Sequence, residues 1–186
     1  MSNHAAYLYW LIVGCEALFW VLLISALAVR YLLRRDRLSR AILFALPAVD
    51  MLLLIFTALD LRAGTPATFA HGLATAYVGF TVAFGSLIVS WADRWFAHRF
   101  ADGPPPVTAA ACGWPAVRSD LMLWLRCILA WAITLALLIA LIAYVDNAAI
   151  TQPLILWFRI ALGSVFFWFV FGPAWSMLFR LRHASS

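Results

Sequence analysis

The sequence predicts an all-α, polytopic membrane protein built as one bundle of five transmembrane helices. The first observation is composition: 66% of the 186 residues are hydrophobic and 11% are charged, where a soluble domain usually carries about 25% charged residues. The second is patterning, because the apolar residues gather into five segments, each close to the ~20 residues that cross the hydrocarbon core of a bilayer. A soluble α/β enzyme needs a more polar surface, and a disordered chain is far less hydrophobic, so both classes are excluded.

Each apolar segment is expected to be a helix, because backbone groups inside lipid must be hydrogen-bonded within their own segment. Together the segments are expected to form a single transmembrane domain. The longest connection is predicted at residues 92–120, and its first part, 93–100, could continue the third span as an amphipathic turn at the membrane surface. The five spans are predicted at residues 7–29, 41–61, 69–91, 121–144 and 154–178.

Arginine placement predicts the orientation. The chain has no lysine, and ten of its thirteen arginines lie in the 30–40 connection, the 92–120 connection and the C-terminal tail. The opposite side carries one arginine, Arg62, so the positive-inside rule predicts an outside N-terminus and a cytoplasmic C-terminus. The arginines flank apolar runs and do not form a polar basic domain, so the net charge of +5 does not predict a nucleic-acid partner. The first span has no Lys or Arg before it, which is the wrong charge order for a cleaved signal peptide.

No motif points to catalysis, a metal or a cofactor. The three cysteines are widely spaced and form no metal-binding cluster with histidine. No Ser/His/Asp set and no phosphate-binding glycine loop is recognisable, so we expect no enzymatic activity. His71 could in principle be a haem ligand, but the other histidines lie in terminal or loop segments and offer no second ligand at similar depth.

Two acidic residues are predicted to lie near the middle of the bilayer. Glu16 and Asp50 each lie about nine residues from a span boundary, which corresponds to a depth of ~14 Å. Such groups are costly in lipid, so they are candidates for a proton or cation site together with Tyr77 and Thr81 of the third span. The alternative is that each is a neutral acid that hydrogen-bonds a neighbouring helix and holds the bundle together.

A second group of charged residues is predicted near the outer face. Arg159 lies roughly 7 Å below the boundary, too deep for a loop charge. It should either reach outward or form an ion pair with Asp60 or Asp146, and the alternative is a site for an anionic ligand or headgroup. His71 is expected to be a hydrogen-bonded or pH-sensitive member of this group. The candidate outer charged cluster comprises Asp60, Arg62, His71, Asp146 and Arg159.

The third span is predicted to be the central helix. Small residues recur along one of its faces at helical spacing and would let another helix approach closely. The predicted helix-packing residues are Gly72, Thr75, Gly79 and Ala83.

The run from Leu59 to Phe100 reads LDLRAGTPATFAHGLATAYVGFTVAFGSLIVSWADRWFAHRF. Together with the arginine-rich connection and the pattern Pro47-x-x-Asp50, it resembles a family of small, uncharacterised, multi-pass proteins of the bacterial inner membrane. The resemblance covers most of the chain. It implies a membrane location and a build of about five helices, and it implies no activity and no catalytic residues.

These observations favour a non-enzymatic accessory or scaffold protein that packs in a membrane complex. The alternative is a small carrier or a proton- or ion-linked permeation protein that uses the intramembrane acids. The expected partners are the lipid bilayer and either another membrane protein or further copies of the chain, with no cofactor.

Overall fold

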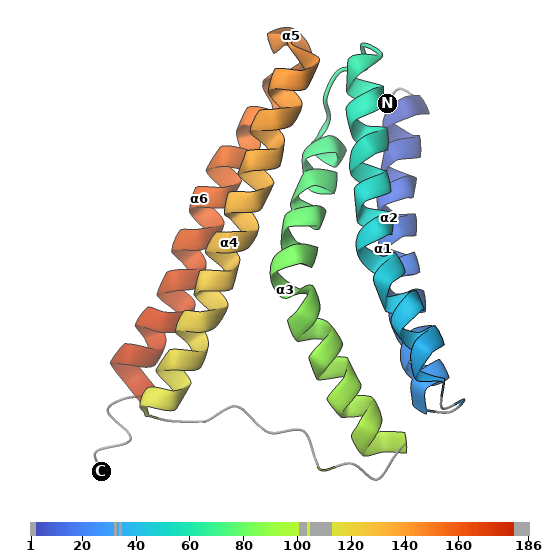
Figure 1. Cartoon of the computed structure of the whole chain (residues 1–186). Coiled ribbons are helices and arrows are strands. Elements are labelled where there is room, and N and C mark those ends of the chain that lie inside the picture. The colour runs from blue at the N-terminus through green and yellow to red at the C-terminus, as the bar shows by residue number, and fades with distance from the viewer. Residues whose placement is uncertain (1–2, 32, 34, 101–103, 105–112, 181–186) are drawn as a thin grey trace.

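The computed structural model describes residues 3–31, 33, 35–100, 104 and 113–180, and every regular element among them is a helix (Figure 1). Short irregular segments join α2 to α3 and α4 to α5. A proline lies in the first turn of α4, where its missing N–H costs no intrahelical bond. The C-terminal part changes from α- to π-helix around Pro173, which cannot donate a backbone hydrogen bond. The elements are α1 (Asn3–Tyr31), α2 (Asp36–Arg62), α3 (Phe69–Phe100), α4 (Trp114–Val145), α5 (Ala148–Thr151), the 3-10 turn η1 (Gln152–Ile155), α6 (Leu156–Phe169), and the π-helical η2 (Val170–Ala174) and η3 (Ser176–Arg180).

Four helical segments of the described chain are long and apolar enough to cross a membrane: Arg37–Arg62, Phe69–Phe100, Trp114–Val145 and Ala148–Phe179. The fourth combines α5, η1, α6, η2 and most of η3 into one continuous helical rod. The all-helical, membrane-spanning class is thereby established. α1 has 29 residues, and its segment Trp20–Tyr31 is apolar.

α3 is the central helix of the bundle. It contacts α1, α2, α4 and η1, whereas α1 packs chiefly against α2, and α6 packs against α4. Figure 1 shows α3 between the α1–α2 pair and the α4–α6 pair, bending near its middle. Of its most apolar 18 residues, 44% are buried, against 17–28% in the other three candidate spans. Side chains on α3 therefore have neighbours on most sides, which favours α3 as the carrier of any internal site.

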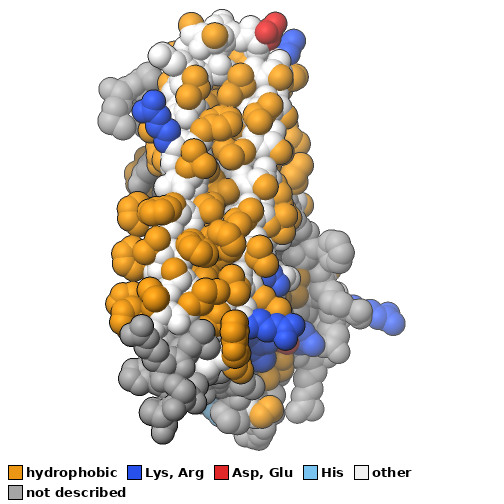
Figure 2. Space-filling view, turned by 90° about the vertical axis from the view of Figure 1, so that its left-hand side faces the viewer, with side chains coloured by type: hydrophobic (Ala, Val, Ile, Leu, Met, Phe, Trp, Pro, Cys, Tyr) orange, Lys and Arg blue, Asp and Glu red, His pale blue; other side chains and the backbone are white. Residues whose placement is uncertain are grey.

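The outer surface of the bundle is apolar. Leu162, Phe166 and Phe171 of the C-terminal rod are each more than 60% exposed. Figure 2 shows the face formed by α4 and α6, where hydrophobic side chains cover the middle and charged side chains lie toward the two ends. A soluble protein rarely exposes so continuous an apolar surface, whereas lipid chains solvate it well.

α3 and α4 both extend beyond the predicted spans. α3 continues to Phe100, so residues 93–100 are helical, and α4 begins at Trp114. Most of the predicted 92–120 connection is therefore helix. At the near end of this connection, Asp93 accepts hydrogen bonds from Arg30 (3.2 Å) and from the Tyr31 hydroxyl (2.9 Å), which joins the end of α1 to α3.

Candidate functional site

Asp50 is buried in the interior of the bundle. Asp50 is 2% exposed, and Thr81 of α3 lies beside its carboxyl group. The carboxyl oxygen Oδ2 is buried without a hydrogen-bond partner among the described residues. The structure thus brings together two of the four residues of the predicted intramembrane site, and it leaves one polar atom there unsatisfied, which is uncommon in a protein interior.

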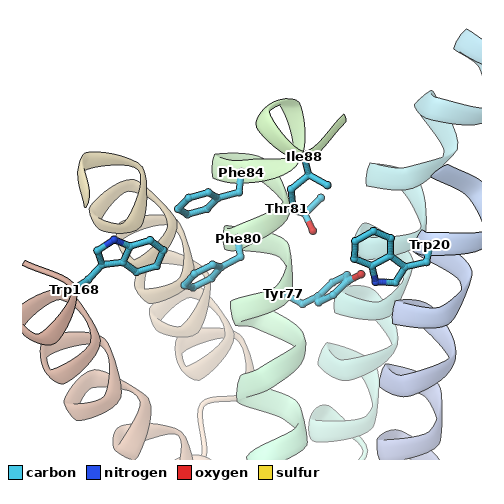
Figure 3. A pocket seen from close by; sticks show the side chains of 8 residues that line it. Trp20, Tyr77, Phe80, Thr81, Phe84, Ile88 and Trp168 are labelled. Atoms are coloured by element: carbon cyan, nitrogen blue, oxygen red, sulfur yellow. The ribbon is translucent and has the colours of Figure 1, made fainter. Parts of the chain in front are cut away.

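A pocket lies beside this pair. It has a volume of about 280 Å³, and both Tyr77 and Thr81 line it. Trp20 of α1 and Trp168 of α6 lie at its two sides, and in Figure 3 the Tyr77 side chain points toward Trp20. Most of the lining is aromatic, so polar contacts within the pocket come from Tyr77 and Thr81.

Glu16 belongs to α1 by its backbone, but its side chain lies outside the described residues. Its position is one helical turn before Trp20, and residues four apart share a helix face. The predicted pairing of Glu16 with Asp50 stays a prediction.

The outer group is organised around His71, whose side chain is fully buried. The backbone N–H of Thr68 donates to Nδ1 (3.0 Å), so the ring hydrogen is on Nε2, which donates to Oδ2 of Asp60 (3.1 Å). The Thr68 hydroxyl also lies 2.9 Å from Nδ1, and the Thr65 hydroxyl donates to Oδ1 of Asp60 (3.0 Å). Thr68 immediately precedes α3 and His71 is its third residue, the position from which a capping-box side chain reaches back to the first backbone N–H. His71 therefore caps α3 and ties it to the end of α2.

The ion pair predicted for Arg159 is absent from the described part of the chain. Asp60 is engaged by His71 and Thr65, and Asp146 is exposed at the end of α4. The reason is geometric: Asp60 faces α3, whereas Arg159 lies exposed on α6, which packs against α4. The position of Arg159 in the sequence predicts its depth in the membrane, whereas the direction it faces depends on the rotation of α6. Arg159 is thus left to reach toward the headgroup region, the other outcome considered for it.

Arg62, a member of the candidate outer charged cluster, contacts α4. Its guanidinium donates to the Tyr144 carbonyl oxygen of α4 (2.8 Å) and stacks over the Tyr144 ring, 4.5 Å from the centroid. The predicted outer charged cluster is therefore two separate groups: the His71–Asp60 pair between α2 and α3, and the Arg62–Tyr144 contact between α2 and α4.

The predicted small-residue stripe of α3 is buried throughout, at Gly72, Thr75, Gly79 and Ala83. A Cβ at Gly79 would lie 3.1 Å from the Thr134 backbone nitrogen and closer still to the Ala130 carbonyl oxygen. At Gly72, the indole of Trp157 occupies the space that a Cβ would take. The stripe is the surface on which α4 and the start of the C-terminal rod approach α3.

Sequence reasoning missed two features of this region. Arg126 of α4 donates to the Ala83 carbonyl oxygen of α3 (2.8 Å). Trp20 and Trp168, which line the pocket, carry no local sequence pattern that marks them as site residues. The His, Cys, Asp and Glu residues that the structure describes form no group of three that could hold a metal ion.

Comparison with known proteins places these features in a family. The chain is 36% identical over 146 residues to the uncharacterized membrane protein YmcC of Bacillus subtilis (strain 168), and the match covers 78% of each chain. No protein-family model and no solved structure matches the chain. The matched length includes most of the helical bundle, and the relative's name assigns a membrane location without an activity.

Proposed function

The chain belongs to the family of membrane proteins that includes YmcC of Bacillus subtilis, and on this premise we propose that it is a non-enzymatic accessory protein of a bacterial inner-membrane complex. The observation that carries the proposal is the surface of α6. This helix packs chiefly on α4, and an apolar groove of about 550 Å³ runs between the two, lined by Trp131, Leu135 and Phe166 among others. Small residues at Ala132 and Ala161 lie in the groove, which suits the close approach of a further transmembrane helix.

The non-enzymatic part of the proposal is supported by the use of His71. Its Nδ1 accepts from the backbone N–H of Thr68, and its Nε2 donates to Asp60, so neither ring nitrogen is free to act as a base. The His–carboxylate pair thereby serves the packing of α2 and α3.

Purification in mild detergent tests the accessory role. A defined membrane protein should co-purify with the wild type, and Ala132→Trp, which fills the groove, should release it. Ala143→Trp is the matched control, because Ala143 is exposed on the same helix outside the groove. Purification as a homo-oligomer without another protein, or equal retention by both variants, contradicts the proposal.

We further propose five spans with the N-terminus outside, α1 being the first of them. The ten-to-one distribution of arginines supports this orientation. Reporters fused after Arg40, near Pro105 and after Arg182 should all report a cytoplasmic location. A periplasmic signal at any of these positions contradicts five spans in this orientation.

A proton- or ion-linked permeation protein is the second candidate function. The unsatisfied Oδ2 of Asp50 in the bundle interior favours it. In proteoliposomes, Asp50→Asn should abolish a pH- or cation-dependent flux that the conservative variant Asp146→Asn retains, since Asp146 is exposed at the end of α4. Absence of flux in the wild type removes this candidate.

A further inference from the structure

The pocket beside Asp50 has aromatic walls. Phe84 stacks on Trp168 of α6 with ring centroids 5.8 Å apart and an interplanar angle of 23°, and Phe80 stacks on Phe84 at 5.9 Å. These contacts hold the rings in place before any ligand arrives. Five of the eight lining residues are aromatic: Trp20, Tyr77, Phe80, Phe84 and Trp168 (Figure 3).

The pocket opens on the lipid-facing surface. Trp20 is 45% exposed and Trp168 is 36% exposed, although both lie along apolar helices. Since lipid chains surround the bundle at this depth, a ligand would enter sideways from the bilayer. Such a ligand must be soluble in lipid, which excludes strongly hydrated metabolites.

A buried acid lies next to the polar side of the pocket. Thr81 lines the pocket and lies beside the carboxyl group of Asp50, which is not itself a lining residue. The Oδ2 atom of Asp50 has no partner in the described structure. A buried carboxylate without a counter-charge is unfavourable, and the Coulomb attraction of a nearby cation is strong because the surroundings have a low dielectric constant.

Three ligand classes can be compared with this arrangement. Ca²⁺ or Mg²⁺ takes six or more oxygen ligands, more than the hydroxyl and carboxyl groups here supply, and the described His, Cys, Asp and Glu residues form no group of three for another metal. A neutral apolar molecule would leave the Oδ2 atom of Asp50 without a polar partner. An organic cation satisfies both parts of the pocket, because the faces of aromatic rings carry negative potential and attract cations.

We propose that this pocket binds a lipophilic organic cation from the bilayer, with the aromatic side chains enclosing the cation and Asp50 acting as its counter-ion. The proposal concerns binding alone. It holds whether the protein packs in a complex or moves the ligand, and its failure would leave the accessory role untouched.

The test uses the full-length protein in nanodiscs of phosphatidylcholine and the cation 1-methyl-4-phenylpyridinium as the probe. Equilibrium dialysis should show saturable binding. Asp50→Asn and Trp20→Leu should each weaken binding roughly tenfold, which corresponds to the loss of one counter-ion or one cation–π contact. The matched controls are Asp146→Asn, an exposed acid, and Trp10→Leu, an exposed tryptophan of α1 outside the pocket; both should bind as the wild type does.

Competition with 4-methylbiphenyl separates charge from shape, because this molecule has nearly the same form as the probe and no charge. Equal competition by the neutral molecule overturns the proposal, as does the absence of saturable binding. Size-exclusion chromatography and thermal unfolding check that each variant is folded. If Asp50→Asn does not fold, Trp168→Leu replaces it, since Trp168 is partly exposed and its truncation should leave the bundle intact. Unchanged binding in both tryptophan variants also overturns the proposal.

Discussion

Replacing Gly79 by alanine should force α3 away from α4. A Cβ at this position would meet the Thr134 hydroxyl and the Ala130 carbonyl oxygen at distances that carbon atoms in proteins do not adopt, and the Thr134 backbone nitrogen at 3.1 Å. Because two of these contacts are backbone atoms of a helix, rotation of one side chain cannot relieve them. Overpacking of this kind costs about 1–3 kcal/mol. The higher helix propensity of alanine offsets at most ~1 kcal/mol of this, so Gly79→Ala should lower the free energy of unfolding by up to about 2 kcal/mol relative to the wild type.

The control for this prediction is Gly163→Ala in α6, where a Cβ meets no atom within 4 Å. This variant gains the same helix propensity without the clash, so its stability should equal or slightly exceed that of the wild type. Unfolding of both variants in mixed detergent micelles, followed by circular dichroism, gives the difference, which should be about 1–3 kcal/mol. Equal stability of Gly79→Ala and Gly163→Ala would refute the close approach of α3 and α4.

Further predictions concern polar contacts. His71→Ala should destabilise the protein by roughly 1–2 kcal/mol, because the Thr68 N–H loses its acceptor, and His71→Gln should recover part of this in thermal unfolding. Arg126→Met should lower the free energy of unfolding by about 1 kcal/mol, because the hydrogen bond to the Ala83 carbonyl is lost, and Arg126→Lys should be intermediate. Stability of Arg126→Met equal to that of the wild type would show that this bond contributes nothing. Asp50→Ala should have a free energy of unfolding about 1–2 kcal/mol lower than that of Asp50→Asn, because the amide can hydrogen-bond to Thr81 beside it, and the reverse order would contradict this contact.

Local sequence patterns predicted the helices and the packing face of α3. Apolar length and the recurrence of small residues are properties of a single helix, so they can be recognised without knowing its neighbours. The partners of Arg159 and Arg126 could not be predicted in this way. A residue's number gives its depth in the membrane, but which helix it faces depends on the rotation and tilt of every helix, and these are set by tertiary packing.

The aromatic pocket shows the same limit. Trp20 and Trp168 are 148 positions apart in the sequence, and neither has a local pattern that distinguishes it from a lipid-facing tryptophan. Thr81 and Asp50 were recognisable because a polar residue in an apolar span is conspicuous by itself. A polar side chain in an apolar helix can therefore be singled out from the sequence. A side chain of a common type, whose neighbours come from other helices, cannot.

The central position of α3 has a consequence for biosynthesis. A membrane protein is inserted from its N-terminus, so α3 reaches the bilayer while its main packing partner α4 is still being synthesised. Until α4 is inserted, the face of α3 that contains Gly72 and Gly79 contacts lipid. In the finished bundle the same face contacts the C-terminal helices. Ribosome stalling or truncation after Phe100 should therefore yield a nascent chain whose most tightly packing surface is open to membrane proteases, whereas chains that include α4 should survive pulse–chase.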